Sequence, residues 1–197
     1  MTDLTPDAPN PSQQNDETGE LGNLLLRLRR KEGTWVEWGQ ACQTLQKAGY
    51  NPQKIFQETG FEPIHQNQVI VASQVYTSLV NAGVSEEVRS HFNRTGSDSL
   101  YEFRILTQPQ RAAAATYAVQ QKLDSIAAKD LAKAMKDFSW MRTLPSGFTD
   151  HPGDAFAYQY WKYAREQSDL QERSRLIAKG LKYAYSDTAR QQVEKLL

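Results

Sequence analysis

The sequence predicts an all-α fold, and three observations support the prediction. Apolar residues recur at steps of three and four through most of the chain, as they do on one face of a helix. Residues suited to helix N-caps repeatedly precede these segments, and glycine often follows them. β-Branched residues never alternate with polar ones over a useful length, which argues against strands. We therefore expect a multi-helix bundle of about nine or ten helices.

Residues 1–20 are expected to form a disordered acidic tail. They contain five acidic residues and no lysine or arginine, and they are rich in Pro, Asn, Gln and Thr. The tail has neither the apolar segment of a secretory signal nor the arginines of a transit peptide, which predicts a cytoplasmic protein. No apolar run approaches the ~20 residues needed to span a bilayer, so no membrane partner is expected.

Residues 21–83 predict a helix-turn-helix-like subdomain. A first helix has a leucine stripe and ends in a basic run, Arg27, Arg29, Arg30 and Lys31. These cations either lie exposed at the C-terminal end of the helix, where they interact favourably with the helix dipole, or contact an acidic surface. Thr34 and Glu37 have the spacing of a capping box, so a second helix begins there and ends near Gly49. Asn51 and Pro52 begin a third helix at once, as N-cap and first helical residue, and Gly60 ends it.

Further packing predictions concern the apolar residues of this subdomain. Trp35, Trp38 and Cys42 lie on one helical stripe and are expected to pack inward, with Phe56 of the third helix also turned inward. Residues from Glu62 to Ala82 predict a helix that is apolar on more than one side, and Gly83 ends both this helix and the subdomain.

Residues 84–197 predict a second, helical subdomain. Its expected helices span residues 85–95, 97–106, 107–123, 127–140, 154–167, 168–184 and 186–197. Thr107 and Gln110 repeat the capping-box spacing, and Asp154, Ser168 and Ser186 are the expected N-caps of the last three helices. The last helix reaches the end of the sequence, so the chain is expected to be part of a longer protein.

The charge distribution decides between a DNA-binding and a protein-binding use of the helix-turn-helix. Lysine plus arginine equals aspartate plus glutamate at 23 each, and residues 21–197 carry a net charge of +5. A DNA-reading helix over Pro52–Thr59 needs several cations beside its base-reading side chains. That segment offers Gln53 and Gln57, but its one cation, Lys54, is offset by Glu58. We therefore expect no nucleic-acid partner, and keep a DNA-binding transcriptional regulator as the alternative function.

No motif for catalysis, metal binding or a cofactor stands out. Cys42 is the single cysteine, and His65, His91 and His151 are scattered without ligand spacing for zinc or iron. Neither nucleotide-binding glycine motif occurs. We expect a protein that is not an enzyme, with no metal and no cofactor.

The helix that follows Asp154 is the main candidate for a partner-binding surface. It holds five aromatic residues in eight positions, too many for one buried face. Phe156, Tyr160 and Ala164 form the natural core line, whereas a second line mixes aromatic and cationic side chains, Tyr158, Trp161, Lys162 and Arg165. That second line is either a half-buried packing face within the bundle or a contact with the partner.

The segment Arg142–Gly153 is expected to be a loop, because it holds two prolines and two glycines. Asp150 and His151 within it are candidate partner-binding residues. Neighbours in sequence rarely present both side chains to one substrate, which argues against a catalytic pair. The loop either ties two parts of the fold together or also offers a contact.

Four segments carry a resemblance to a known family. WVEWGQACQTLQKAGYNPQKIFQETGFEP and DHPGDAFAYQYWKYAREQ, with LYEFRIL and SWMRTLPSGF between them, resemble the Rubisco accumulation factor 1 family over about residues 21–197. The resemblance implies the N-terminal α-domain of a Rubisco assembly chaperone of the cyanobacterial type, acting in carbon dioxide fixation. Family members continue into a β-sheet domain that dimerises, and this sequence stops before it.

The resemblance also implies a partner and a mode of action. Dimeric family members are expected to clamp an antiparallel pair of Rubisco large subunits after chaperonin-assisted folding, and to leave as small subunits join. Because the dimerising domain is absent from this sequence, we expect the present chain to be a monomer that binds large subunits weakly.

Overall fold

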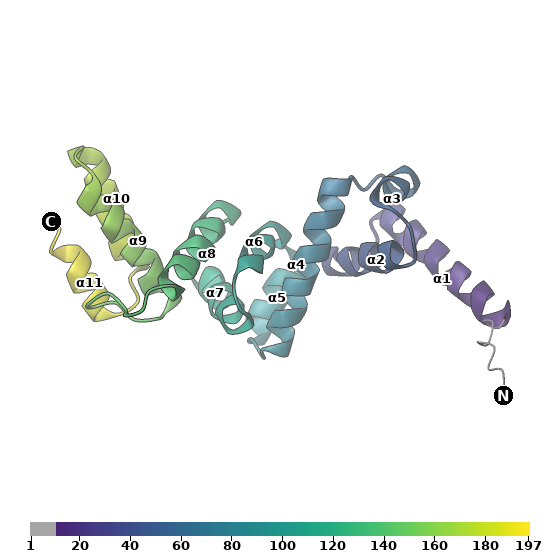
Figure 1. The fold of residues 1–197 in the computed structure, drawn as a ribbon, viewed down its shortest axis with the longest axis horizontal. Coiled ribbons are helices and arrows are strands. Elements are labelled where there is room, and N and C mark those ends of the chain that lie inside the picture. The colour runs from purple at the N-terminus through teal and green to yellow at the C-terminus, as the bar shows by residue number, and fades with distance from the viewer. Residues whose placement is uncertain (1–10) are drawn as a thin grey trace, which may run out of the picture. The chain divides into compact units, whose positions relative to one another are not determined.

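The computed structural model describes residues 11–197 of the chain, with side chains from Thr18 onward. Eleven α-helices and one short 3-10 helix account for the regular structure of these residues, and none of them forms a strand (Figure 1). The all-α prediction is confirmed, although there are more helices than the nine or ten expected. None of the described helices combines the length and the apolar character that crossing a membrane requires.

The described chain divides into two compact units, and the division falls between Ile70 and Val71, inside helix α4 (Pro63–Asn81). The boundary expected from the sequence lies later, at Gly83, where α4 has ended. The difference arises because the second half of α4 contacts the helices that follow it. The Tyr76 hydroxyl donates to the carbonyl of Arg89, and the Gln108 amide donates to the carbonyl of Ser78.

The first unit contains helices α1 (Pro11–Arg30), α2 (Trp35–Lys47) and α3 (Pro52–Thr59), together with the start of α4. Helix α1 begins ten residues before residue 21, the expected start of the subdomain. Proline suits the first position of a helix, and the glutamines and glutamates that follow are good helix formers. Residues 11–20 of the expected disordered tail are therefore helical, and residues 1–10 lie outside the described part of the chain.

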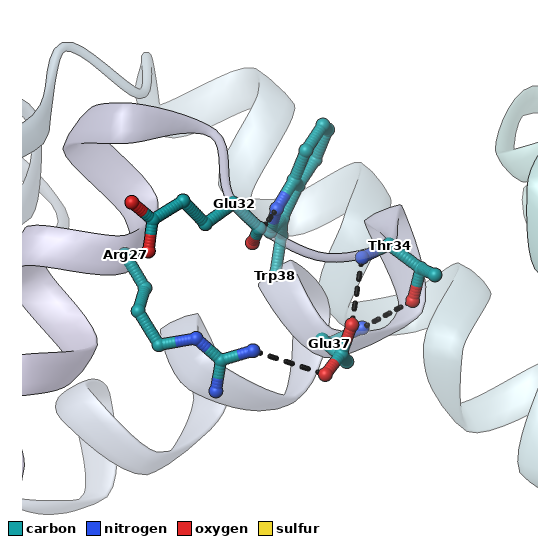
Figure 2. A network of polar contacts seen from close by, with 5 residues as sticks. All are labelled: Arg27, Glu32, Thr34, Glu37 and Trp38. Atoms are coloured by element: carbon teal, nitrogen blue, oxygen red, sulfur yellow. Dashed lines mark hydrogen bonds and ion pairs between the residues drawn. The ribbon is translucent and has the colours of Figure 1, made fainter.

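The two helix starts predicted in this unit are confirmed. The Thr34 hydroxyl accepts from the N–H of Glu37 at 3.3 Å, and the Glu37 carboxylate accepts from the N–H of Thr34 at 2.7 Å, as Figure 2 shows. The Asn51 side chain accepts from the N–H of Lys54 at 2.8 Å, and Gly60 ends α3 in the left-handed conformation. These contacts satisfy backbone donors that a helix leaves unpaired at its start.

The core of the first unit is formed by Leu28, Ala41, Cys42, Leu45, Ile55, Phe61 and Val69. Trp35 is buried and Trp38 packs edge-on against Phe61, in agreement with the inward stripe expected for α2. The prediction for Phe56 is wrong, since its side chain is 37% exposed while Ile55 is fully buried. Ile55 and Thr59 form the buried line of this short helix, and Phe56 lies beside that line.

The second unit contains the rest of α4, helices α5 (Glu86–Arg94) and α6 (Ser97–Glu102), the 3-10 helix η1 (Phe103–Ile105), and helices α7 (Gln108–Gln121), α8 (Ser125–Ser139), α9 (Pro152–Glu166), α10 (Leu170–Tyr183) and α11 (Asp187–Glu194). The single helix expected over residues 97–106 is therefore an α-helix followed by a 3-10 turn. Thr107 and Gln110 form the capping box expected for α7.

Two expected N-caps in this unit are wrong, one by three residues and the other by one. His151, not Asp154, caps α9, which begins at Pro152, and Asp169, not Ser168, caps α10. Ser186 caps α11 as expected. The expected loop between α8 and α9 is confirmed, and it ends at His151 because Pro152 occupies the first helical position, which suits its fixed backbone angle.

Helices α9, α10 and α11 pack around a small apolar core. Its fully or nearly fully buried members are Ala164, Ile177 and Val193, with Trp161 partly buried against them. On another side of α9, Phe156 stacks on Tyr183 of α10 with ring centres 4.5 Å apart. These contacts hold the aromatic helix α9 on two sides, and they position the candidate site.

Candidate protein-binding surface

The N-terminus of α9 is built around the buried carboxylate of Asp154, the residue expected as the N-cap. Asp154 is fully buried and accepts five hydrogen bonds, from the N–H and hydroxyl of Thr149, the N–H of Tyr185, and the N–H and hydroxyl of Ser186. The distances run from 2.6 Å for the Ser186 hydroxyl to 3.0 Å for the Thr149 N–H. Asp154 therefore ties the α8–α9 loop to the connection between α10 and α11.

Opposing effects act on the pKa of Asp154. Burial raises the pKa of this carboxyl, but the hydrogen bonds from Ser186 and Thr149 together outweigh burial and hold the pKa below its ordinary value. The group is therefore ionised at neutral pH, with its negative charge distributed over five donors.

His151 and Asp150 lie just before α9, but they do not form a catalytic pair. The His151 Nδ1 accepts from the N–H of Gly153 at 3.0 Å, and its ring stacks on Tyr185 with centres 3.5 Å apart. Burial lowers the pKa of His151, while Asp154 and Asp150 raise it by less, so the neutral ring is favoured. Asp150 is exposed. The imidazole nitrogen that an orienting carboxylate would need is engaged as a helix cap.

Gly153 shows how closely this region is packed. A Cβ atom at this position would lie 2.6 Å from the backbone carbonyl oxygen of Tyr183, and 3.1 Å from the Tyr117 ring and its hydroxyl. The Tyr117 hydroxyl donates to the same Tyr183 carbonyl at 2.7 Å. Only glycine lets the start of α9 approach the end of α10 this closely.

Tyr158 and Trp161 belong to an aromatic cluster inside the second unit. The ring of Tyr158 lies 5.1 Å from Phe148 and 5.5 Å from Phe138, and it stacks on Trp161 at 5.5 Å. The Trp161 indole N–H donates to the carbonyl of Gln192 on α11 at 3.1 Å. Both residues are half-buried, so they pack within the fold and retain an accessible edge.

Arg165 and Lys162 are the exposed members of the same helical line. The Arg165 guanidinium lies 4.6 Å from the centre of the Trp161 ring, a cation–π arrangement. Neither cation pairs with a carboxylate among the described residues. The second half of α9 therefore presents two cations beside an aromatic edge, and arginine with tryptophan is a pair of residue types enriched at protein–protein interfaces.

The six predicted site residues fall into two groups rather than one. Tyr158, Trp161, Lys162 and Arg165 share α9, whereas Asp150 and His151 precede it, about 15 Å away along the helix axis from Trp161. Sequence reasoning missed Asp154 and Ser186 as a linked pair. Pro152 could have placed the start of α9 correctly, but nothing in the sequence indicates a contact across 32 residues.

The three arginines of the first unit are all paired with carboxylates. Arg27 pairs with Glu37 at 3.0 Å (Figure 2), and Arg29 contacts both the carboxylate and the backbone carbonyl of Glu58. Arg30 pairs with Glu32. In α3 the single cation, Lys54, lies over the Tyr50 ring at 4.2 Å. Cations that are already paired with carboxylates attract phosphate groups only weakly.

Cys42 and the histidines show no metal or nucleophile geometry. Among the described residues, no group of three or more His, Cys, Asp or Glu side chains could hold a metal ion. Burial raises the pKa of the Cys42 thiol to about 11, which keeps it protonated and unreactive at neutral pH.

Comparison with known proteins connects this geometry to a family. The family model described as the Rubisco accumulation factor 1 helix turn helix domain matches residues 20–80, and that described as its alpha helical domain matches residues 92–197. The first match lies on the helix-turn-helix helices, and the second runs from the end of α5 through α11.

Individual relatives agree with this assignment. RuBisCO accumulation factor 1 of Nostoc sp. is 58% identical over 197 residues, covering 100% of this chain and 54% of the relative. RuBisCO accumulation factor 1 of Synechocystis sp. is 56% identical over 90% of this chain and 50% of its own length. The chloroplastic Rubisco accumulation factor 1.1 of Arabidopsis thaliana is 35% identical over 90% of this chain and 41% of its own length.

The chain thus spans about half the length of the curated cyanobacterial relatives it matches. The two family models begin within α1 at residue 20 and end at residue 197, and they leave residues 81–91 between them unmatched. On these matches, the chain belongs to the Rubisco accumulation factor 1 family.

Proposed function

We propose that this chain is an assembly chaperone domain that binds Rubisco large subunits and stabilises their antiparallel dimer before the holoenzyme assembles. It acts in the cytoplasm by binding alone, without catalysis, cofactor or nucleic acid. Membership of a family whose members are named Rubisco accumulation factors is the observation that carries the proposal.

The α9 surface supports a binding role. Arg165 and Lys162 are exposed cations without carboxylate partners among the described side chains, and they lie beside the Trp161 ring. We propose this surface, with Tyr158, as one contact with the large subunit. The exposed Asp150 and the half-buried His151 form a second contact at the start of α9.

Binding to large subunits is the direct test. Large subunits released from a chaperonin refolding reaction are passed over immobilised chain, with small subunits added in a second step. Retention of large subunits, followed by their release as small subunits bind, is the expected result. If large subunits flow through at every concentration tested, the proposed function is wrong.

Affinity and oligomeric state provide a quantitative check. We expect the 197-residue chain to be a monomer, which acts as a single arm of a clamp. Because a dimeric clamp gains ~10²-fold to 10⁴-fold in avidity over a single arm, the monomer should bind large subunits weakly. Sedimentation measures the oligomeric state, and titration calorimetry measures the affinity. Nanomolar binding by the monomer would contradict the proposal that tight binding depends on a dimeric clamp.

A DNA-binding function is separated from this proposal by salt dependence. A protein that contacts several phosphates loses affinity steeply as salt rises. Because Arg27, Arg29 and Arg30 are already paired within the first unit, we expect no shift of duplex DNA in a gel at any salt concentration.

A further inference from the structure

Trp140 differs from the other tryptophans of the chain. Trp35 is 7% exposed, and the indole N–H groups of Trp38 and Trp161 donate to the carbonyls of Glu32 and Gln192. Trp140 is 73% exposed, and its indole N–H has no acceptor among the described residues. Large exposed aromatic side chains of this kind mark interaction surfaces.

The loop that begins at Trp140 is exposed at its start and anchored at its end. Leu144 is 42% exposed, and Arg142 and Thr143 between them are exposed. By contrast, Phe148 is 6% exposed, its N–H donates to the Pro145 carbonyl, and Thr149 is held by Asp154. The end of the loop is thus held in place while its apolar first residues are exposed. Such a loop suits binding, because it loses less conformational entropy when a partner binds.

The segment around the exposed aromatic ring is positively charged. The Lys136 ammonium lies 5.5 Å from the centre of the Trp140 ring, and Arg142 and Lys133 are exposed nearby in the sequence. None of these three cations pairs with a carboxylate among the residues described. Asp137 is the one acidic residue from Lys133 to Leu144, so the segment has a net positive charge.

From these observations we infer that Trp140, with Leu144 beside it in the loop, docks into an apolar pocket rimmed by carboxylates on a folded protein partner. Lys136 and Arg142 face those carboxylates. This inference rests on the proposed function, under which that partner surface belongs to the Rubisco large subunit. Charge complementarity selects an acidic rim, and the Trp140 ring supplies the apolar anchor.

The test compares variants of the 197-residue chain for binding to purified large subunits by biolayer interferometry. Trp140→Ala is expected to weaken binding at least tenfold, and Trp140→Phe to weaken it less. Ile126→Ala is the matched control, because Ile126 is also 73% exposed and lies at the other end of α8. All three variants are expected to keep the wild-type thermal melting curve.

Charge reversal tests the acidic rim separately. The double variant Lys136→Glu with Arg142→Glu is expected to bind at least tenfold more weakly at low salt, with the difference shrinking as salt rises. Lys195→Glu on the distant end of the chain is the control. An unchanged affinity for the double variant would overturn the acidic-rim assignment.

The outcomes separate this inference from the proposed function. If the wild-type chain does not bind large subunits, the proposed function fails and this inference falls with it. If the wild type binds and Trp140→Ala binds equally well, the inference alone is wrong. Self-association that Trp140→Ala abolishes, measured by sedimentation, would assign the surface to a second copy of the chain and would also overturn the inference.

Discussion

The carboxylate of Asp154 accepts hydrogen bonds from both the backbone N–H and the hydroxyl of Ser186, at 2.9 and 2.6 Å. The Ser186 hydroxyl in turn accepts from the N–H of Ala189 and so caps α11. One buried charge thus fixes the start of α11 as well as the loop before α9. The positions of the α9 surface and of α11 depend on this contact.

Replacing Asp154 by alanine is expected to lower the free energy of unfolding by about 2–4 kcal/mol. The substitution leaves the N–H groups of Thr149, Tyr185 and Ser186 without their acceptor in a part-buried site. Urea unfolding measures the change. Asp150→Ala is the matched control, since Asp150 is exposed and its removal should stay within about 0.5 kcal/mol. Equal unfolding midpoints for the two variants would contradict this account.

The same carboxylate is expected to make stability depend on acid pH. Because hydrogen bonds hold the folded-state pKa of Asp154 below its ordinary value of 3.8, the unfolded chain binds its proton first as pH falls. The contribution of Asp154 is complete well above pH 3.8 and is lost as pH falls below that value through the folded-state pKa. Asp154→Asn, which cannot titrate, should lack this component in urea unfolding between pH 5 and 2. Parallel pH profiles for both proteins would contradict it.

His151 is expected to contribute a second pH dependence, nearer neutrality. Burial places its folded-state pKa below the ordinary 6.5, so stability is complete above pH 6.5 and falls as pH drops below it. Protonation of Nδ1 would also remove the acceptor for the Gly153 N–H. His151→Asn keeps a capping side chain and should show a smaller loss of stability from pH 7.5 to 5.5. His65→Asn, in the first unit, is the control and should follow the wild type.

Trp161 and Arg165 are expected to behave differently when truncated, although they touch. Trp161→Ala should destabilise the second unit by about 2 kcal/mol, because it removes the aromatic cluster contacts and the bond to Gln192. Arg165→Ala should cost about 0.5–1 kcal/mol, the value of an exposed cation–π contact, yet weaken large-subunit binding.

Thermal melting and binding must be measured on the same preparations for this pair. Tyr163→Ala, on the same helix and 40% exposed, is the control for a general effect of truncation. If Arg165→Ala leaves the affinity for large subunits unchanged, the second line of α9 is only a packing face of the bundle.

The capping box of α2 is expected to stabilise the first unit independently. Thr34→Ala removes the acceptor for the Glu37 N–H and should cost about 1 kcal/mol (Figure 2). Thr34→Ser retains the hydroxyl and should lose much less. Circular dichroism during urea unfolding measures both variants. A Thr34→Ala protein as stable as the wild type would show that the cap contributes nothing to folding.

The candidate site was predictable only in part. The mixture of aromatic and cationic residues on α9 follows from helical spacing, so Tyr158, Trp161, Lys162 and Arg165 were identified together. Spacing does not reveal how deeply a side chain is buried, and the packing of Phe138 and Phe148 against Tyr158 decides that. Asp154 was placed on the wrong side of the helix start, because aspartate is favoured both at the N-cap and within the first turn.

The sequence by itself determined what depends on neighbours along the chain: the all-α class, the capping boxes at Thr34 and Thr107, the stops at Gly60 and Gly83, and the absence of nucleotide motifs. These features arise from local hydrogen bonds and local periodicity, which act within a few residues. The tertiary structure alone decided that Ile55 and not Phe56 is buried, that Asp154 joins Thr149 to Ser186, and that Trp140 stays exposed. Each of those outcomes depends on which distant segment packs against the residue, and no local preference encodes that choice.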